Sequence, residues 1–253
     1  MFRKKFIEKQ IGTQTPFRWR SHEITRVEGF SDAVFAFAVT LLVVSLEVPR
    51  TFSDLMETMS GFGAFACGFA LLFLVWYNQY KFFRRYGLQD TLTLTLNGIL
   101  LFVVLFFVYP LKFLFTTLIK AFTRQDLAVH LHDGSVVAPI VPDQWQILMV
   151  IYGLGYVAIF GTFALLYFHA VRKTDELNLT AIEMFLTRMS LRENLLQVGI
   201  GIISILIVTI GGNKMAGLSG MTYVLVGPVM TFHGMWSGKR LRALLSSQGE
   251  LQK

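Results

Sequence analysis

Long apolar runs alternate with short polar and charged stretches along the whole chain. Runs such as "GILLFVVLFFV" and "VGIGIISILIVTI" are apolar on every side and lack the two-residue alternation of a membrane-barrel strand. A helix needs about 20 apolar residues to cross ~30 Å of hydrocarbon. Runs of that kind predict six membrane-spanning helices, at residues 29–49, 55–77, 92–119, 145–171, 195–211 and 216–236.

The composition supports a membrane protein. Hydrophobic residues make up 54% of the chain and charged residues 15%, whereas an average soluble domain has about 25% charged residues. Residues 1–28 hold seven basic side chains but no apolar run, so they do not resemble a cleaved signal peptide. We therefore predict an all-α integral membrane protein with a basic N-terminal segment (1–28), a membrane domain (29–236) and a C-terminal tail (237–253).

Lysine and arginine are distributed unevenly about these runs. In the six-helix arrangement, 18 of the 23 basic residues fall on the side of the membrane that holds both termini. Basic loops stay on the cytoplasmic side of a membrane, so both termini are predicted to be cytoplasmic. The net charge of +7 is then a signal of topology and of contact with the lipid bilayer, and no nucleic-acid partner is predicted.

Signatures of catalysis and metal binding are missing from the sequence. It contains no glycine-rich phosphate loop, HExxH or GxSxG. His130 and His132 form a pair in the 120–143 loop, but two ligands are too few for a zinc site. Cys67 is the single cysteine, so no intrachain disulfide can form, and we expect a buried thiol. Neither an enzyme nor a metal or cofactor site is predicted.

The first apolar run has one uniform stripe when it is drawn as a helix. Steps of three and four residues place seven side chains in a stripe about 100° wide: Phe30, Ala33, Phe37, Thr40, Leu41, Val44 and Val48. Thr40 is its one polar member. Taken alone, such a stripe is compatible with ordinary helix packing in a membrane bundle.

Two charged residues stand at the start of the same run. Asp32 lies away from Phe37, and Arg26 precedes Asp32 by six positions. Six positions amount to roughly 240° around a helix, which rules out the usual three- or four-residue pairing. Each must find its partners on other helices, because unpaired polar groups in a membrane are costly.

The stretch "RVEGFSD" contains an Arg-x-x-x-Phe-Ser-Asp signature formed by Arg26, Phe30, Ser31 and Asp32. With six helices and cytoplasmic termini, it resembles the prokaryotic branch of the transmembrane protein 175 family, the endolysosomal-type potassium channels. The exit "LLFLVWYNQYKFFRR", with Trp76, and the run "LTLNGILLFVVLFFVYP", with Asn97, are also similar to that family. Two departures are Asn78 and Gln79, where the family commonly has histidine, and the large ring of Phe37, where relatives carry isoleucine or leucine.

The resemblance implies a homotetramer in the prokaryotic plasma membrane, with four copies of the first helix around a central pore. Phe37, Leu41 and Val44 would then form apolar constriction rings, with the Thr40 hydroxyls between them. No "TVGYG" filter occurs. The expected permeant ions are monovalent cations, with potassium preferred, and apolar rings can gate such a pore by dewetting.

The remaining motif residues are predicted to support this helix. We expect Arg26, Ser31 and Asp32 to form a polar network with Trp76, Asn78 or Asn97 of the next two helices, and we expect Glu28 to matter less for stability. Two alternatives stay open. One is a secondary or proton-coupled transporter in which Asp32 is the coupling acid. The other is a scaffold protein.

Overall fold

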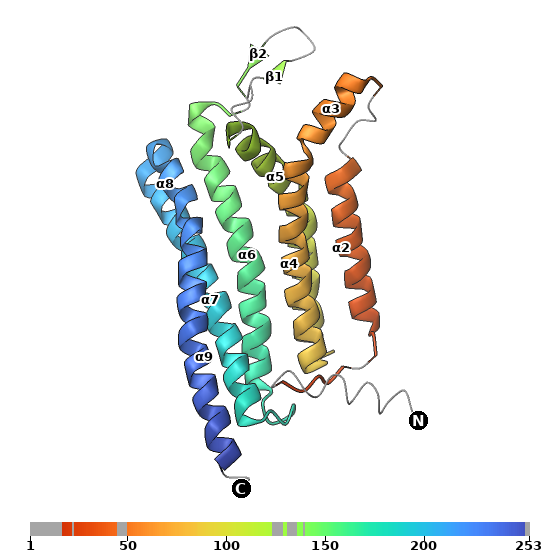
Figure 1. The fold of residues 1–253 in the computed structure, drawn as a ribbon, viewed down its shortest axis with the longest axis vertical. Coiled ribbons are helices and arrows are strands. Elements are labelled where there is room, and N and C mark those ends of the chain that lie inside the picture. The colour runs from red at the N-terminus through yellow and green to blue at the C-terminus, as the bar shows by residue number, and fades with distance from the viewer. Residues whose placement is uncertain are drawn as a thin grey trace.

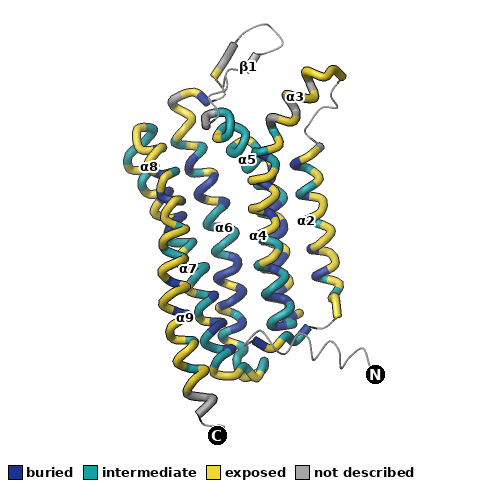
Figure 2. Tube along the Cα trace, in the orientation of Figure 1, coloured by how far each residue is buried: buried dark blue, intermediate teal, exposed yellow. Residues whose placement is uncertain are grey.

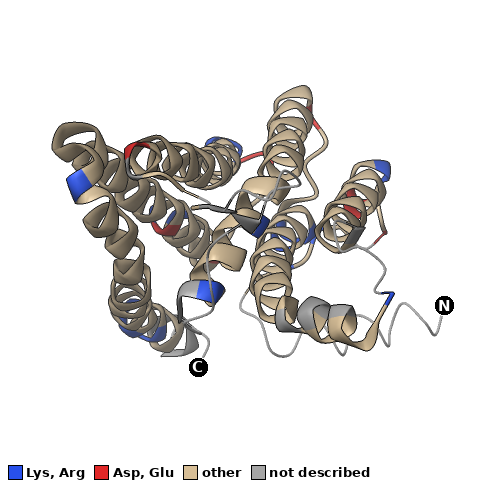
Figure 3. Ribbon diagram, turned by 90° about the horizontal axis from the view of Figure 1, so that it is seen from above, with Lys and Arg blue, Asp and Glu red and all other residues tan. Residues whose placement is uncertain are grey.

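Long helices arranged side by side form most of the molecule in a computed structural model of the chain (Figure 1). The structure describes residues 17–21, 23–44, 50–122, 129–130, 136–138 and 140–250. The helices are α2 (Arg26–Val44), α3 (Phe52–Ser60), α4 (Phe62–Tyr86), α5 (Thr91–Phe122), α6 (Trp145–Arg172), α7 (Ala181–Gly211), α8 (Ala216–Met221) and α9 (Val226–Glu250). Most of their length is free of charge (Figure 3).

Short elements connect these helices. The 3-10 turns are η1 (Pro142–Gln144), η2 (Gly212–Met215) and η3 (Thr222–Leu225). Strands β1 (Val129–His130) and β2 (Val136–Val137) pair antiparallel in the connection between α5 and α6. His132 lies outside the described residues. Apart from this two-residue ladder, the described part of the chain is helical wherever it has regular structure, as the apolar runs predict.

By length and composition, four continuous helical stretches could cross a membrane: Phe62–Tyr86, Thr91–Lys120, Trp145–Arg172 and Ala181–Ser246. The last stretch contains a reversal, because α7 and α9 lie side by side and are joined through α8 (Figure 1). The chain is therefore a multi-pass membrane protein. Helix α2 is outside these four stretches and carries Arg26, Glu28 and Asp32 in its first seven residues.

Several helix boundaries differ from the sequence prediction. Helix α7 begins at Ala181, well before the expected residue 195, because Thr180 and Glu183 form a capping box. Thr180 Oγ1 accepts a hydrogen bond from the Glu183 amide (3.2 Å), and Glu183 Oε2 accepts one from the Thr180 amide (3.0 Å). The expected helix at 55–77 is divided at Gly61 between α3 and α4. The expected helix at 216–236 is interrupted by η3, and α9 continues through most of the predicted tail. The start of α7 is thus set by a local cap, which hydropathy does not register.

The main apolar core lies among α2, α4, α5, α6 and α7. Its fully buried members include Phe82, Phe83, Leu100, Phe163 and Leu166. Many residues on the outward faces of the helices are exposed, as the yellow stretches of Figure 2 show. A large number of these exposed residues are apolar. Cys67 is on such a face and is exposed, which corrects the expectation of a buried thiol.

The residues just before α2 are bound to the base of the bundle. Arg20 Nη2 donates to Glu183 Oε2 (2.8 Å) at the start of α7, and the Arg20 amide donates to the Arg84 carbonyl (3.0 Å) at the end of α4. Phe17 is buried edge-to-face against Tyr86. These contacts hold the beginning of α2 in place relative to both α4 and α7.

Candidate functional site

Helix α2 has two faces with opposite environments. Phe35, Ala38 and Leu42 are buried against α4 and α5, and Phe35 keeps only 4% of its surface exposed. Phe37, two residues after Phe35, is 55% exposed. Apolar side chains occur on both faces of α2, so the helix is not amphipathic. One apolar face is therefore covered by the chain itself and the other is left uncovered.

The uncovered face coincides with much of the stripe derived from helical periodicity. Phe30, Ala33, Phe37 and Thr40 are exposed, and Leu41 is half-buried against the core. Val44 ends α2, but its side chain lies outside the described residues, and so does Val48. The structure thus brings four of the seven stripe residues onto one open surface.

Thr40 supplies the polar atom of this surface. Its hydroxyl donates a 2.9 Å hydrogen bond to the carbonyl of Ala36, one turn earlier. A threonine hydroxyl that donates to its own helix keeps its oxygen lone pairs as acceptors. The open face can therefore offer oxygen atoms to a cation at one level, with apolar side chains on either side.

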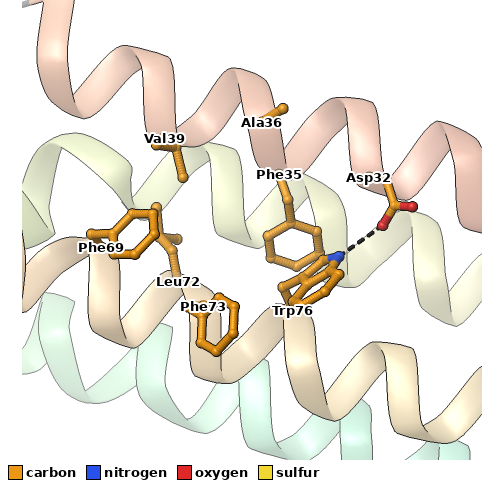
Figure 4. A pocket seen from close by; sticks show the side chains of 8 residues that line it. All are labelled: Asp32, Phe35, Ala36, Val39, Phe69, Leu72, Phe73 and Trp76. Atoms are coloured by element: carbon orange, nitrogen blue, oxygen red, sulfur yellow. Dashed lines mark hydrogen bonds between the residues drawn. The ribbon is translucent and has the colours of Figure 1, made fainter.

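Asp32 and Trp76 meet across α2 and α4, and a cavity of about 290 Å³ lies beside them. Trp76 Nε1 donates a 2.7 Å hydrogen bond to Asp32 Oδ1 (Figure 4). Rings along α4 line the other wall of the cavity, among them Phe69 and Phe73. Asp32 itself remains exposed. The carboxylate thus joins two helices without being enclosed by them.

A buried chain of hydrogen bonds connects α4, α5 and α2 one layer deeper. Gln79 Nε2 donates to Asn97 Oδ1 (3.0 Å), Asn97 Nδ2 donates to Ser31 Oγ (3.0 Å), and Ser31 Oγ donates to the Val27 carbonyl (2.8 Å). All three side chains are buried. Satisfied polar chains of this kind specify how helices pack, because an unpaired member would be costly.

Sequence reasoning named Ser31 and Asn97 for this region but missed Gln79. Asn78, which was proposed instead, is half-buried and takes no part in the chain of hydrogen bonds. The three-residue spacing between Trp76 and Gln79 could have identified Gln79 from the sequence. Gln79 follows Trp76 by three positions, so both fall on one side of α4, whereas Asn78 points elsewhere.

Within this chain, Glu28 has more polar contacts than Arg26, although Arg26 was the residue expected in the polar network. Arg26 is exposed and forms no hydrogen bond or ion pair within the described residues. Glu28 is buried, with 6% of its surface exposed, and caps α2: its Oε2 accepts from the Thr25 amide (2.8 Å), and Thr25 Oγ1 accepts from the Glu28 amide (3.2 Å). Glu28 Oε1 also lies 3.7 Å from Arg84 Nε. The polar support of α2 therefore includes Glu28, the acid that we expected to matter less.

The far end of α2 has a cationic partner that sequence reasoning also missed. Lys112 of α5 donates from Nζ to the carbonyl of Leu42 (3.2 Å). A cation is favourable at the C-terminal end of a helix, where unpaired carbonyls gather. Both ends of α2 are thus held by polar contacts from the same chain.

The sequence is similar to known potassium channels. A family model described as "Endosomal/lysosomal potassium channel TMEM175" matches residues 26–107, which include α2 and α4. A protein of Marivirga tractuosa named "Potassium channel" is 40% identical over 245 residues, covering 96% of this chain and 99% of that relative. A shorter match, 30% identical and covering 49% of this chain, is to a potassium channel of Chamaesiphon minutus.

Solved structures show the same similarity. The crystal structure of a variant of the potassium channel MtTMEM175, in complex with a nanobody fusion protein, superposes with a TM-score of 0.78 at 39% identity, covering 90% of this chain and 100% of that one. A TMEM175 homologue from Chamaesiphon minutus shares the fold, with a TM-score of 0.52 at 23% identity. The predicted family resemblance is confirmed: the chain belongs to the TMEM175 family of potassium channels.

Proposed function

We propose that the protein is a potassium-permeable channel whose pore lies on the axis of a homotetramer, with α2 of each subunit lining it. The observation that carries this proposal is the uncovered face of α2. Phe37 and Thr40 are exposed on a helix whose other side is packed into the core and held by polar contacts at both ends. In the proposed assembly, this face meets the ion path and the equivalent helices.

The proposed pore wall gives a simple mechanism. Rings formed by Phe37, Leu41 and Val44 surround the path with apolar surface, where a partly dehydrated ion finds no replacement ligands. Thr40 hydroxyl oxygens provide ligands at one level. Such a pore gates by dewetting and prefers potassium to sodium because sodium loses more hydration energy on entering a narrow apolar passage.

We also propose six crossings of the plasma membrane, because the last of the four apolar stretches crosses twice, through α7 and α9, and α2 adds one more crossing. Both termini would lie in the cytoplasm, because most basic residues fall on their side. Single cysteines in a Cys67→Ala background test this topology. Labels at Glu23, Gln89 and Glu176 should react from the cytoplasmic side, and labels at Ser53 and Lys214 from the other side. All five positions are exposed. One label on the wrong side would contradict the arrangement.

Cation flux from liposomes that contain the purified protein tests the pore. We expect fast potassium efflux, a larger efflux for Leu41→Asn, because the amide wets the constriction, and a changed potassium-to-sodium ratio for Thr40→Val. Efflux no faster than from empty liposomes would contradict the channel. Efflux that is insensitive to both substitutions would place the pore elsewhere in the molecule.

A further inference from the structure

An apolar groove runs between α7 and α9, at the edge of the bundle opposite α2 (Figure 1). Its volume is about 520 Å³, and its lining is almost wholly apolar apart from one histidine. The lining residues are Leu196, Pro228, Val229, Phe232, His233 and Trp236. Phe232 is among the most exposed large side chains of the chain. The chain itself therefore leaves this groove open.

A contact between α7 and α9 shows which residues of the two helices lie at the same level. His233 Nδ1 of α9 lies 3.7 Å from Glu193 Oε1 of α7. Since α7 and α9 run in opposite directions, residues before Glu193 lie level with residues after His233 (Figure 1). The lower end of the groove is thus formed by the first half of α7 and the second half of α9.

Four cations continue the groove at that lower end. Arg192 and Arg188 precede Leu196 by four and eight positions and so lie on its side of α7. Lys239 and Arg240 follow Trp236 by three and four positions on α9, and all four side chains are exposed. Arg240 also stacks on Trp236, with Cζ 3.9 Å from the ring centroid.

Acidic residues offset little of this charge. The described parts of α7 and α9 contain Glu183, Glu193 and Glu250. Glu183 is buried and bound to Arg20, and Glu250 is at the last turn of α9, so only Glu193 borders the groove. The surface therefore combines an apolar trough with a net positive end, and an aromatic ring lies at the boundary between them.

We propose that the α7–α9 groove binds one anionic phospholipid of the bilayer, with an acyl chain along the trough and the phosphate among Arg192, Lys239 and Arg240. An acyl chain gains from close contact with the trough, and guanidinium groups match phosphate oxygens in a bidentate geometry. Basic clusters between membrane helices attract anionic headgroups. Each cation contributes about 1 kcal/mol of binding free energy, which corresponds to about fivefold in affinity. This site does not depend on α2 lining the pore.

Lipid retention by the delipidated full-length protein, measured by native mass spectrometry, tests the proposal. The probes are dioleoylphosphatidylglycerol, dioleoylphosphatidylcholine and glycerol phosphate. We expect preferential retention of phosphatidylglycerol, and a loss of that preference of about fivefold for each of Arg192→Gln and Arg240→Gln. Arg172→Gln is the matched control, because Arg172 is exposed and stacks on Phe168 of α6 in a similar way, but away from the groove.

Leu196→Trp tests the trough separately, since the larger ring should fill it and lower retention of both lipids. Equal retention of the two lipids, or retention that none of the groove substitutions changes, would overturn the proposal. Competition by glycerol phosphate alone would show a site for free phosphate instead of a lipid. A change of oligomeric state in these variants would show that a second copy covers the groove. Potassium efflux is measured on the same preparations, so loss of lipid preference and loss of the channel are distinguishable.

Discussion

Trp76 of α4 donates a 2.7 Å hydrogen bond from its indole nitrogen to Asp32 Oδ1 of α2 (Figure 4). A second, buried chain of hydrogen bonds runs through Gln79, Asn97 and Ser31, so two sets of polar contacts join the first half of α2 to its neighbours. Neither set could exist within one helix. Asp32 is thereby bound to a neighbouring helix of the same chain, as a residue that supports α2 would be.

Trp76→Phe should destabilise the protein by about 0.6–2 kcal/mol, the range of an interhelical hydrogen bond in a membrane. The substitution keeps most of the ring packing and removes the donor. Thermal unfolding in detergent measures the change. Tyr77→Phe is the control on the same turn of α4, since Tyr77 is exposed and its hydroxyl has no role in this hydrogen bond. Equal unfolding temperatures for Trp76→Phe and the parent protein would contradict the prediction.

Glu28→Ala should cost more stability than Arg26→Ala. The first removes the capping box of α2 and leaves Arg84 without its acid, for which we expect about 1–2 kcal/mol from the cap alone. The second trims an exposed side chain, and its effect on unfolding of the single chain should be below about 0.5 kcal/mol. The same unfolding measurement applies. The opposite order would mean that Arg26 has a partner in another subunit.

Phe35→Ala and Phe37→Ala should separate folding from conduction. Phe35 is 4% exposed, so its truncation should cost about 3–5 kcal/mol. Phe37 is 55% exposed, so its truncation should change stability by less than about 1 kcal/mol while raising cation leak through the proposed constriction. Unfolding and liposome efflux are measured on both variants. Equal effects on efflux at positions 35 and 37 would argue against a pore lined by α2.

Asp90 should make stability sensitive to acid. It lies in the turn between α4 and α5, where burial alone would raise its pKa, but hydrogen bonds from Thr93 (2.7 Å) and His169 (2.8 Å) outweigh burial and lower it. A carboxyl group whose pKa is lower in the folded than in the unfolded state stabilises the protein when the pH is above the unfolded pKa, here about 3.8. This stabilisation is lost as the pH falls through the folded-state pKa.

We therefore expect the parent protein to lose more stability than Asp90→Asn when the pH is lowered from neutral to below about 4. Unfolding temperature in detergent as a function of pH measures the difference. Asp175→Asn is the control, since Asp175 is exposed in the connection between α6 and α7. Parallel pH profiles for the parent protein and Asp90→Asn would show that the Thr93 and His169 contacts do not stabilise the fold.

The sequence by itself determined the class, the positions of most long helices and the family. Apolar runs are local and must be helical in a membrane, because every backbone polar group there needs a partner within the segment. The stripe of α2 could be predicted because helical periodicity is also local: it places Phe30, Phe37 and Thr40 on one face whatever surrounds the helix. The start of α7 was missed although the capping pair Thr180 and Glu183 is visible in the sequence.

Only the tertiary structure decided which polar residues meet. Glu28 rather than Arg26 supports α2, and Gln79 rather than Asn78 joins Asn97. These choices depend on the rotation of α2 and α4 about their axes, and that rotation is set by the packing of Phe35, Phe82 and other core side chains from distant segments. A polar side chain in a membrane must find some partner, but the sequence alone does not say which one, because partners on different helices are brought together only by that packing.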